Sequence, residues 1–153
     1  DLWHVPHDKA AGEALSEYFS SLTGREAGDP KSVDINQRAL NLLADAPGVA
    51  WASFSTLCEE PRGSADYVEM AREYHTVLIE QIPLLDRDKE DAARRFINLV
   101  DEFYDRNVKL IATADQPPET LYDGSRLRFE FDRTMSRLQE MRTQEYLKAE
   151  HRP

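Results

Sequence analysis

The sequence predicts an α/β fold built around a parallel sheet. Two apolar runs, residues 75–81 (HTVLIEQ) and 107–115 (NVKLIATAD), have the length and composition of buried strands. Between them, residues 90–106 (EDAARRFINLVDEFYDR) place Phe96 and Phe103 on one apolar side of a helix. A strand, a helix and a strand at this spacing form a right-handed βαβ crossover, so we expect the two strands to run parallel.

The amino-terminal part of the chain predicts one helix. Asp8 is a suitable N-cap, and apolar residues recur at helical spacing as far as Leu22, before Gly24 stops the pattern. The turn-forming stretch GREAGDPKS that follows indicates a connector. Residues 1–30 are therefore expected to form a helix and a connector.

The next part predicts a small β-hairpin region over residues 31–57. Residues 33–43 (VDINQRALNLL) and 48–54 (GVAWASF) have strand composition, and the turn-like ADAPG separates them, so they are expected to form a hairpin or a small sheet. After a Pro-Arg-Gly turn, residues 64–74 (SADYVEMAREY) predict a helix with Ser64 as its cap.

The carboxyl-terminal part predicts a loop and one last helix. Arg106 and Asn107 suit the negative end of the long helix and a left-handed exit from it. QPPETLYDGS has loop composition, and a helical period then runs from about Phe131 to Leu147. The expected regions are residues 1–30 (helix and connector), 31–57 (hairpin region), 58–125 (α/β core) and 126–153 (C-terminal helix).

Composition narrows the classes of function. The formal net charge of -10 repels nucleic-acid backbones, so nucleic acid is not an expected partner. No apolar run reaches the roughly 18 to 20 residues that span a bilayer, and the start of the chain has no signal-peptide pattern. The single cysteine, Cys58, excludes an intrachain disulfide and suits a reducing compartment, so we expect a cytoplasmic protein.

Four stretches along the chain resemble the carboxyl-terminal half of the ZapE-type cell-division ATPases, a branch of the AAA-like P-loop family with mitochondrial relatives. They are LWHVPHD, VAWASFSTLCEEPRGSADYVEMAREYHTVLIEQIP, AARRFINLVDEFYDRNVKLIATAD and FEFDRTMSRLQEMRTQEYL. The chain departs from the family at WASF, where an acidic residue between two aromatics is more common, and at IATAD, where serine-alanine-acid is more common.

The resemblance implies that this chain is the part of a P-loop ATPase that follows the nucleotide-binding motifs. It implies that the complete protein hydrolyses ATP with Mg²⁺, forms a homo-oligomer and acts at the division site on FtsZ, the tubulin-like ring protein. This chain contains neither GxxxxGK[ST] nor GxGxxG, so it lacks the glycine-rich amides and the lysine that cradle a triphosphate. We therefore expect these residues to bind no nucleotide by themselves and to be inactive alone.

Arginine recurs four times within twelve residues of this acidic chain, at Arg126, Arg128, Arg133 and Arg137. Arg133 and Arg137 are four residues apart, so they share a helix face and could reach one anion. Oligomeric P-loop ATPases need an arginine that neutralises charge on the transferred phosphoryl group, and either residue is a candidate finger or sensor. The alternative is surface pairing with carboxylates such as Glu130, Asp132 and Glu140.

A polar stripe on the long helix offers rival arginines. The stripe consists of Arg94, Asn98, Asp101 and Asp105. It could face a nucleotide or a neighbouring subunit, with Arg94 or Arg95 as the finger. The alternative is the solvated side of an amphipathic helix with internal ion pairs.

Polar residues follow both predicted parallel strands. Glu80 and Gln81 end the first strand, and Thr113 to Asp115 end the second. Ligands of open parallel sheets bind outside the carboxyl ends of the strands, so these residues are expected to meet at one functional edge. The alternative is that they only solvate the strand ends.

Two other pairs of residues have weaker signals. His4 and His7 have a His-x-x-His spacing but no third ligand nearby in sequence, so an ordinary loop is favoured over a metal site. Cys58 and His75 are a nominal nucleophile and base, without a visible third partner.

The sequence is compatible with three functions. The first is a part that completes a P-loop ATPase and supplies an arginine. The second is a non-enzymatic docking module for a division protein, which would bind through residues 33–54 and the Pro-Arg-Gly turn. The third is a metal hydrolase that uses His4, His7 and a carboxylate.

Overall fold

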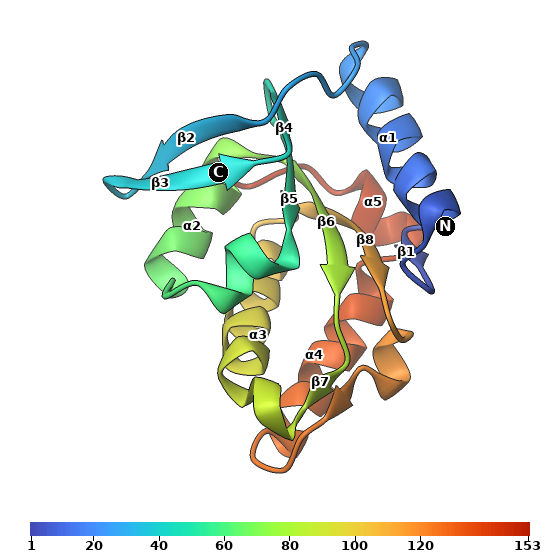
Figure 1. Ribbon diagram of the computed structural model, residues 1–153, viewed down its shortest axis with the longest axis vertical. Coiled ribbons are helices and arrows are strands. Elements are labelled where there is room, and N and C mark those ends of the chain that lie inside the picture. Colours follow the sequence, from blue (N-terminus) through green and yellow to red (C-terminus); the bar gives the residue numbers. More distant parts are fainter.

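A computed structural model describes residues 1–153, and a five-stranded sheet lies at its centre (Figure 1). The strands lie in the order β1 (Trp3–His4), β8 (Lys109–Ala114), β6 (Thr76–Ile82), β5 (Val49–Ser53) and β4 (Ala44–Ala46). Every neighbouring pair from β1 to β5 is parallel, whereas β4 is antiparallel to β5. The carboxyl ends of four strands therefore lie at one edge of the sheet.

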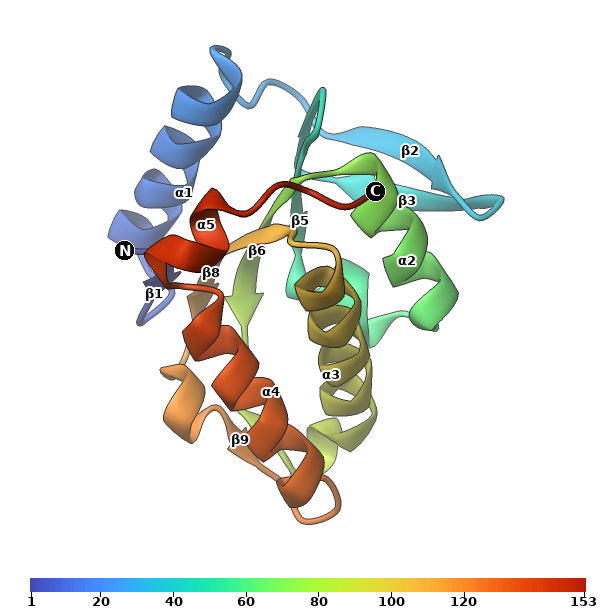
Figure 2. The same cartoon turned by 180° about the vertical axis from the view of Figure 1, so that it is seen from behind.

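Helices cover both faces of this sheet. Helix α1 (Lys9–Thr23) packs on one face, while α2 (Ser64–Glu73) and α3 (Glu90–Asp105) lie on the other. Helix α4 (Arg128–Glu140) packs beside α3, and the short α5 (Gln144–Lys148) follows it (Figure 2). Successive side chains of a strand point to opposite faces of the sheet, so the same strands contribute to a hydrophobic cluster on each face. Leu78 and Ile111 belong to the smaller cluster under α1, and Val77 belongs to the larger cluster under α2 and α3.

The predicted βαβ unit is confirmed. Strands β6 and β8 are parallel neighbours, with Leu78 opposite Ile111, and α3 connects them. The predicted ends of helices are also confirmed at two places. Asp8 accepts a 2.9 Å hydrogen bond from the Ala11 amide, and Asn107 leaves α3 in the left-handed region with φ 55°.

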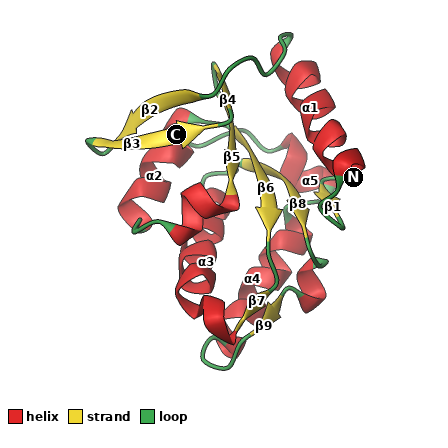
Figure 3. Cartoon of the chain, in the orientation of Figure 1, coloured by secondary structure: helices red, strands yellow, loops and turns green.

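The hairpin region differs in its pairing from the sequence prediction (Figure 3). Residues 33–43 fold on themselves, because β2 (Lys31–Ile35) and β3 (Arg38–Leu42) are joined by Asn36 and Gln37, both at positive φ. The second predicted strand, β5, instead joins the main sheet beside β6. The composition of a short apolar strand does not reveal its partner, so the sequence could not show that β5 pairs with β6 rather than with residues 33–43.

Two helix predictions were wrong in detail. Ser64 is the first residue of α2 and not its cap; the side chain of Asp66 accepts from the Gly63 amide at 3.1 Å instead. The last helix is broken after α4, and Thr143 caps α5. The break turns the chain so that the buried hydroxyl of Tyr146 donates to Val108 O at 2.7 Å, a tertiary contact that a helical period cannot predict.

Short elements connect the larger ones. Strands β7 (Leu85–Asp86) and β9 (Tyr122–Asp123) form a small parallel pair beyond the end of β6. Single helical turns occur at Ser55–Glu59, Arg87–Lys89 and Pro118–Thr120. None of the helices combines the length and the apolar composition that a membrane crossing requires.

Candidate functional site

The two strand ends expected to meet do so at the carboxyl edge of the sheet. The buried hydroxyl of Thr113, at the end of β8, accepts a hydrogen bond of 2.9 Å from the Gln81 amide of β6. The His7 ring comes to the same place, with Nδ1 2.7 Å from Thr113 Oγ1 and Nε2 2.9 Å from the Gln81 side-chain amide. These three residues, which we call the edge network, tie the loop after β1 to the two central strands.

Backbone geometry at Gln81 marks the same edge. Its φ is 63°, and the register between β6 and β8 shifts between Ile79 and Ile82. A residue other than glycine in this region of φ is uncommon and is maintained by its surroundings, here by the hydrogen bond to Thr113. The bulge directs the Gln81 side chain to His7.

Glu80, the other residue predicted at this edge, faces a different partner. Its carboxylate accepts a hydrogen bond of 2.8 Å from the Trp51 indole on the neighbouring strand β5. Trp51 packs against Phe19 of α1, at 6.0 Å between ring centroids. Glu80 therefore lies on the α1 side of the sheet and orients an aromatic residue of the smaller core.

A second polar cluster joins α3 and α4. The carboxylate of Asp101 pairs with Arg133 Nη2 at 3.2 Å and, through its other oxygen, with Arg137. Arg137 also lies over the Tyr104 ring, 4.7 Å from its centroid, and Tyr104 donates to Glu140 at 2.8 Å. The stripe on the long helix and the arginine series, which the sequence presented separately, therefore face each other.

The rival arginines on α3 have other contacts. Arg94 pairs with Glu130 of α4 at 3.2 Å, and Arg95 donates to the Cys58 carbonyl at 3.3 Å. Arg128 pairs with Asp132 within α4. The arginines of this cluster thus contact α3, α4 and the turn at Cys58, and none of them hydrogen-bonds to the edge network.

The two nominal residue pairs do not assemble into reactive sites. His7 belongs to the edge network, whereas His4 packs edge-on against Tyr18, and no group of three acidic, histidine or cysteine side chains is placed to hold a metal ion. Burial is the main reason that the pKa of His4 is lowered. Burial is also the main reason that the pKa of the Cys58 thiol is raised. His75 contacts Thr76 and lies near His151, so it does not serve Cys58 as a base.

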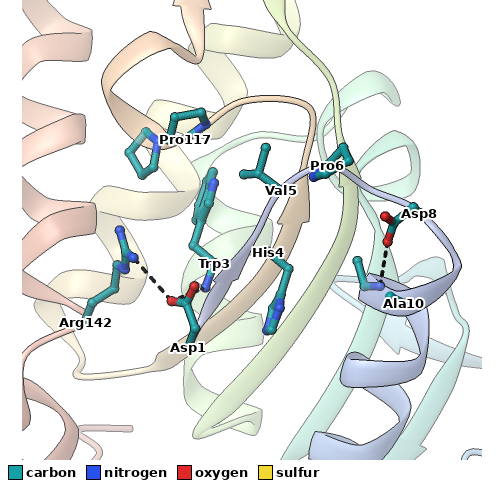
Figure 4. Close-up of a pocket in the computed structure, with 11 residues that line it drawn as sticks. Asp1, Trp3, His4, Val5, Pro6, Asp8, Ala10, Pro117 and Arg142 are labelled. Carbon is teal, nitrogen blue, oxygen red and sulfur yellow. Dashed lines mark hydrogen bonds and ion pairs between the residues drawn. The ribbon is translucent and has the colours of Figure 1, made fainter.

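A pocket of about 470 Å³ lies beside β1, where sequence reasoning placed no site (Figure 4). Trp3 and Pro117 form part of its wall, and the Trp3 indole donates to Gln116 O at 2.9 Å. Arg142 reaches Asp1 at 3.3 Å across it. Strand β1 has only two residues, so no periodicity in the sequence could have predicted this meeting of distant segments.

The mixed α/β architecture with a mostly parallel sheet is consistent with a P-loop ATPase fold. More specifically, the chain belongs to the AFG1-like ATPase family, whose model matches residues 1–150.

Curated relatives agree with this family. The chain is 42% identical to the cell division protein ZapE of Escherichia coli K12 over 151 residues, which cover 98% of this chain and 40% of that protein. It is 30% identical to lactation elevated protein 1 homolog B of Danio rerio over 179 residues, covering 95% of this chain and 36% of the relative. The chain thus spans about 40% of the length of its bacterial relative. No solved structure matches it.

Proposed function

We propose that this chain is the carboxyl-terminal part of an ATPase that hydrolyses ATP with Mg²⁺ and acts in bacterial cell division on an FtsZ-type ring protein at the division site. The observation that carries the proposal is the match to the AFG1-like ATPase family over residues 1–150. The phosphate-binding loop belongs to polypeptide outside these residues, since the sequence has no GxxxxGK[ST]. The chain alone is inactive and completes the fold of the whole protein.

Within this function, the arginines on α4 supply positive charge to the phosphoryl group. Asp101 holds both Arg133 and Arg137 on the same side of the helix, so one carboxylate orients two guanidinium groups. The Arg133 side chain is 59% exposed, whereas that of Arg137 is 25% exposed and stacks on Tyr104. Exposure therefore favours Arg133 as the finger and Arg137 as the residue that positions it.

The arginines of α3 are weaker candidates. Arg95 is partly buried and donates to the Cys58 carbonyl, which fixes it to the core. Arg94 is half exposed but pairs with Glu130, which is itself on α4. Arg94 and Arg95 therefore support the contact between elements, and a role in hydrolysis is assigned first to Arg133.

Substitution in the full-length protein tests this assignment. Arg133→Ala and Arg137→Ala are expected to lower ATP turnover by about 10³-fold or more while the affinity for ATP stays within a few-fold. Arg72→Ala is the control, because Arg72 is similarly exposed and pairs only with Glu69 within α2. Turnover that stays normal in both α4 variants would exclude the finger.

One observation favours docking as a second candidate function. Strand β2 hydrogen-bonds only to β3, so its outer edge presents free backbone groups to which an extended segment could add. A division protein that binds the hairpin would be retained by this chain alone in a pull-down. Binding only by the nucleotide-loaded full-length protein would instead support the ATPase proposal.

A further inference from the structure

The last residues of the chain lie across the amino ends of β6 and β8. The Lys109 ammonium group, at the start of β8, donates to Ala149 O, and the Arg152 amide donates to Arg106 O at 2.8 Å. Figure 2 shows this segment running from α5 to α2. We call residues 149–152 the tail. None of its residues is buried, so polar contacts and not apolar packing hold the tail in place.

His151 joins the tail to α2. Its Nε2 donates to Ala71 O, one of the last carbonyl oxygens of the helix, which have no partner within it. A carbonyl oxygen only accepts hydrogen bonds, so Nε2 carries the proton and Nδ1 is free to take up a second one. His151 therefore caps the carboxyl end of α2, and the tail links this end to Arg106 at the end of α3.

A second histidine lies beside the first. The His75 ring is edge-on to the His151 ring, at 6.4 Å between centroids. Its Nδ1 is 2.9 Å from Thr76 Oγ1, and its Cδ2 and Nε2 atoms lie so close to Gly48 that a Cβ there would collide with them. The His75 ring is thus enclosed between the tail and the turn before β5, although other parts of the residue are exposed.

Groups that carry positive charge, or can take it up, act on the His75 ring from two elements. They are His151 of the tail and the Lys109 ammonium group of β8, whereas the turn before β5 contributes only backbone. The nearest carboxylates along the chain, Glu73 at the end of α2 and Glu150 of the tail, are exposed, and neither pairs with a histidine. Partial burial is the main reason that the pKa of His75 is lowered, and the two positive groups add to this effect.

We infer that His75 and His151 form an acid-sensitive latch, which releases the tail when His75 takes up a proton. The proton places a positive charge on a ring that already lies near Lys109 and against the backbone of Gly48. Release removes His151 and exposes the His75 ring to water, so the released state binds the proton more tightly than the docked state. Protonation of His75 therefore favours release.

The direction of the pH dependence follows from the two states. The pKa of His75 is close to its ordinary value of 6.5 in the released state and lower in the docked state. The docked tail is therefore most stable at pH values above 6.5. It loses stability as the pH falls from that value through the docked-state pKa, because the released state then binds more protons.

Release changes one end of the molecule and leaves the other intact. The carboxyl end of α2 loses its cap at Ala71 O, and Arg106 O at the end of α3 loses the Arg152 amide. The edge network lies at the opposite ends of β6 and β8, so it is expected to stay in place. The latch needs neither ATP nor a partner protein, and it therefore stands apart from the proposed function.

Hydrogen exchange in the full-length protein tests the latch between pH 8 and pH 5, the range in which a histidine changes its charge. Fragmentation of the peptide that contains the tail reads the Arg152 amide, which donates to Arg106 O. After correction for the intrinsic effect of pH on exchange, we expect the protection of this amide to fall about threefold or more at pH 5. Residues 109–114 of β8 should keep their protection. Constant protection of Arg152 would overturn the latch, and so would an equal loss in both segments, which indicates general unfolding.

Two substitutions identify the histidine that responds. His75→Asn keeps a side-chain amide next to Thr76 but cannot take up a proton, so it should abolish the fall in Arg152 protection. His151→Gln keeps a donor for Ala71 O without a titratable ring, so it should reduce the fall. A fall that stays undiminished in either variant would contradict the latch.

His7→Asn is the matched control for these substitutions. It also removes a histidine, but His7 belongs to the edge network at the far ends of the strands. The fall in Arg152 protection should therefore be the same as in the unmodified protein. Loss of the fall in this variant as well would show that the tail does not respond to His75 in particular.

Discussion

The carboxylate of Asp101 on α3 pairs with the guanidinium group of Arg137 on α4, and its second oxygen pairs with Arg133. Asp101→Asn removes the charge that holds both arginines. Because the pairs are partly exposed, we expect the free energy of unfolding to fall by only about 0.5–2 kcal/mol. Urea unfolding of the 153-residue chain measures this. The difference in stability between the variant and the unmodified chain should shrink in 1 M salt, because the Debye screening length is then only about 3 Å. A loss of stability that does not change with salt would contradict the electrostatic cause.

Glu90 makes the stability of the fold depend on pH. The Tyr122 hydroxyl, at 2.6 Å, is the main cause that lowers the pKa of this carboxyl below its ordinary value of 4.5, and the Arg126 amide adds to it. A carboxyl whose pKa is lower in the folded than in the unfolded state contributes its full stabilisation at pH values above the unfolded-state pKa. This contribution is lost as the pH falls through the folded-state pKa. Glu90→Gln should therefore be less stable at pH 7, with the difference shrinking in acid. Thermal unfolding across pH checks this, with exposed Glu150→Gln as the unaffected control.

Gly48 is required by the turn before β5. Its φ is 78°, and a Cβ there would lie 2.5 Å from the His75 ring. We expect Gly48→Ala to lower the free energy of unfolding by about 1–3 kcal/mol, from strain and the displaced ring. Gly12→Ala is the matched control: it lies within α1 with open space around it, and should stabilise by up to about 1 kcal/mol. Chemical denaturation measures the free energy of unfolding of both variants. Equal changes in the two variants would contradict the steric explanation for Gly48.

Thr113 holds the edge network together. Thr113→Val keeps the buried volume but leaves the Gln81 amide without its acceptor, so we expect a loss of about 1–3 kcal/mol. Thr113→Ser retains the hydroxyl and should preserve the network. The His7 ring signals in NMR report the difference directly: they should move in the valine variant and stay near their positions in the serine variant. Unmoved signals in both would show that His7 does not depend on Thr113.

Patterns that repeat within one element predicted the core of the fold. The apolar side of α3 and the runs that became β6 and β8 were sufficient to predict parallel neighbours, because a connecting helix of that length leaves few other arrangements. The meeting of Gln81 with Thr113 followed from the same geometry. Asp8 and Asn107 were predictable because caps are local.

Features that depend on distant partners could not be predicted in this way. Strand β1 is too short to show a period, so the arrival of His7 at the strand ends was not visible. The break before α5 depends on a pocket for Tyr146 between α3 and β8. The sequence places Asp101 and Arg137 on separate helices, and only the packing of α4 against α3 reveals that they pair. The role of these arginines in hydrolysis stays a proposal.

The position of Tyr146 has a consequence for synthesis. Its hydroxyl joins Phe103 O and Val108 O, and the Arg152 amide donates to Arg106 O at 2.8 Å, so the last residues close the junction between α3 and β8. A nascent chain in which residues 146–152 are still inside the ribosome cannot make these contacts. Native packing at this junction is therefore completed only after those residues emerge, and until then the apolar end of β8 is open to association with other chains.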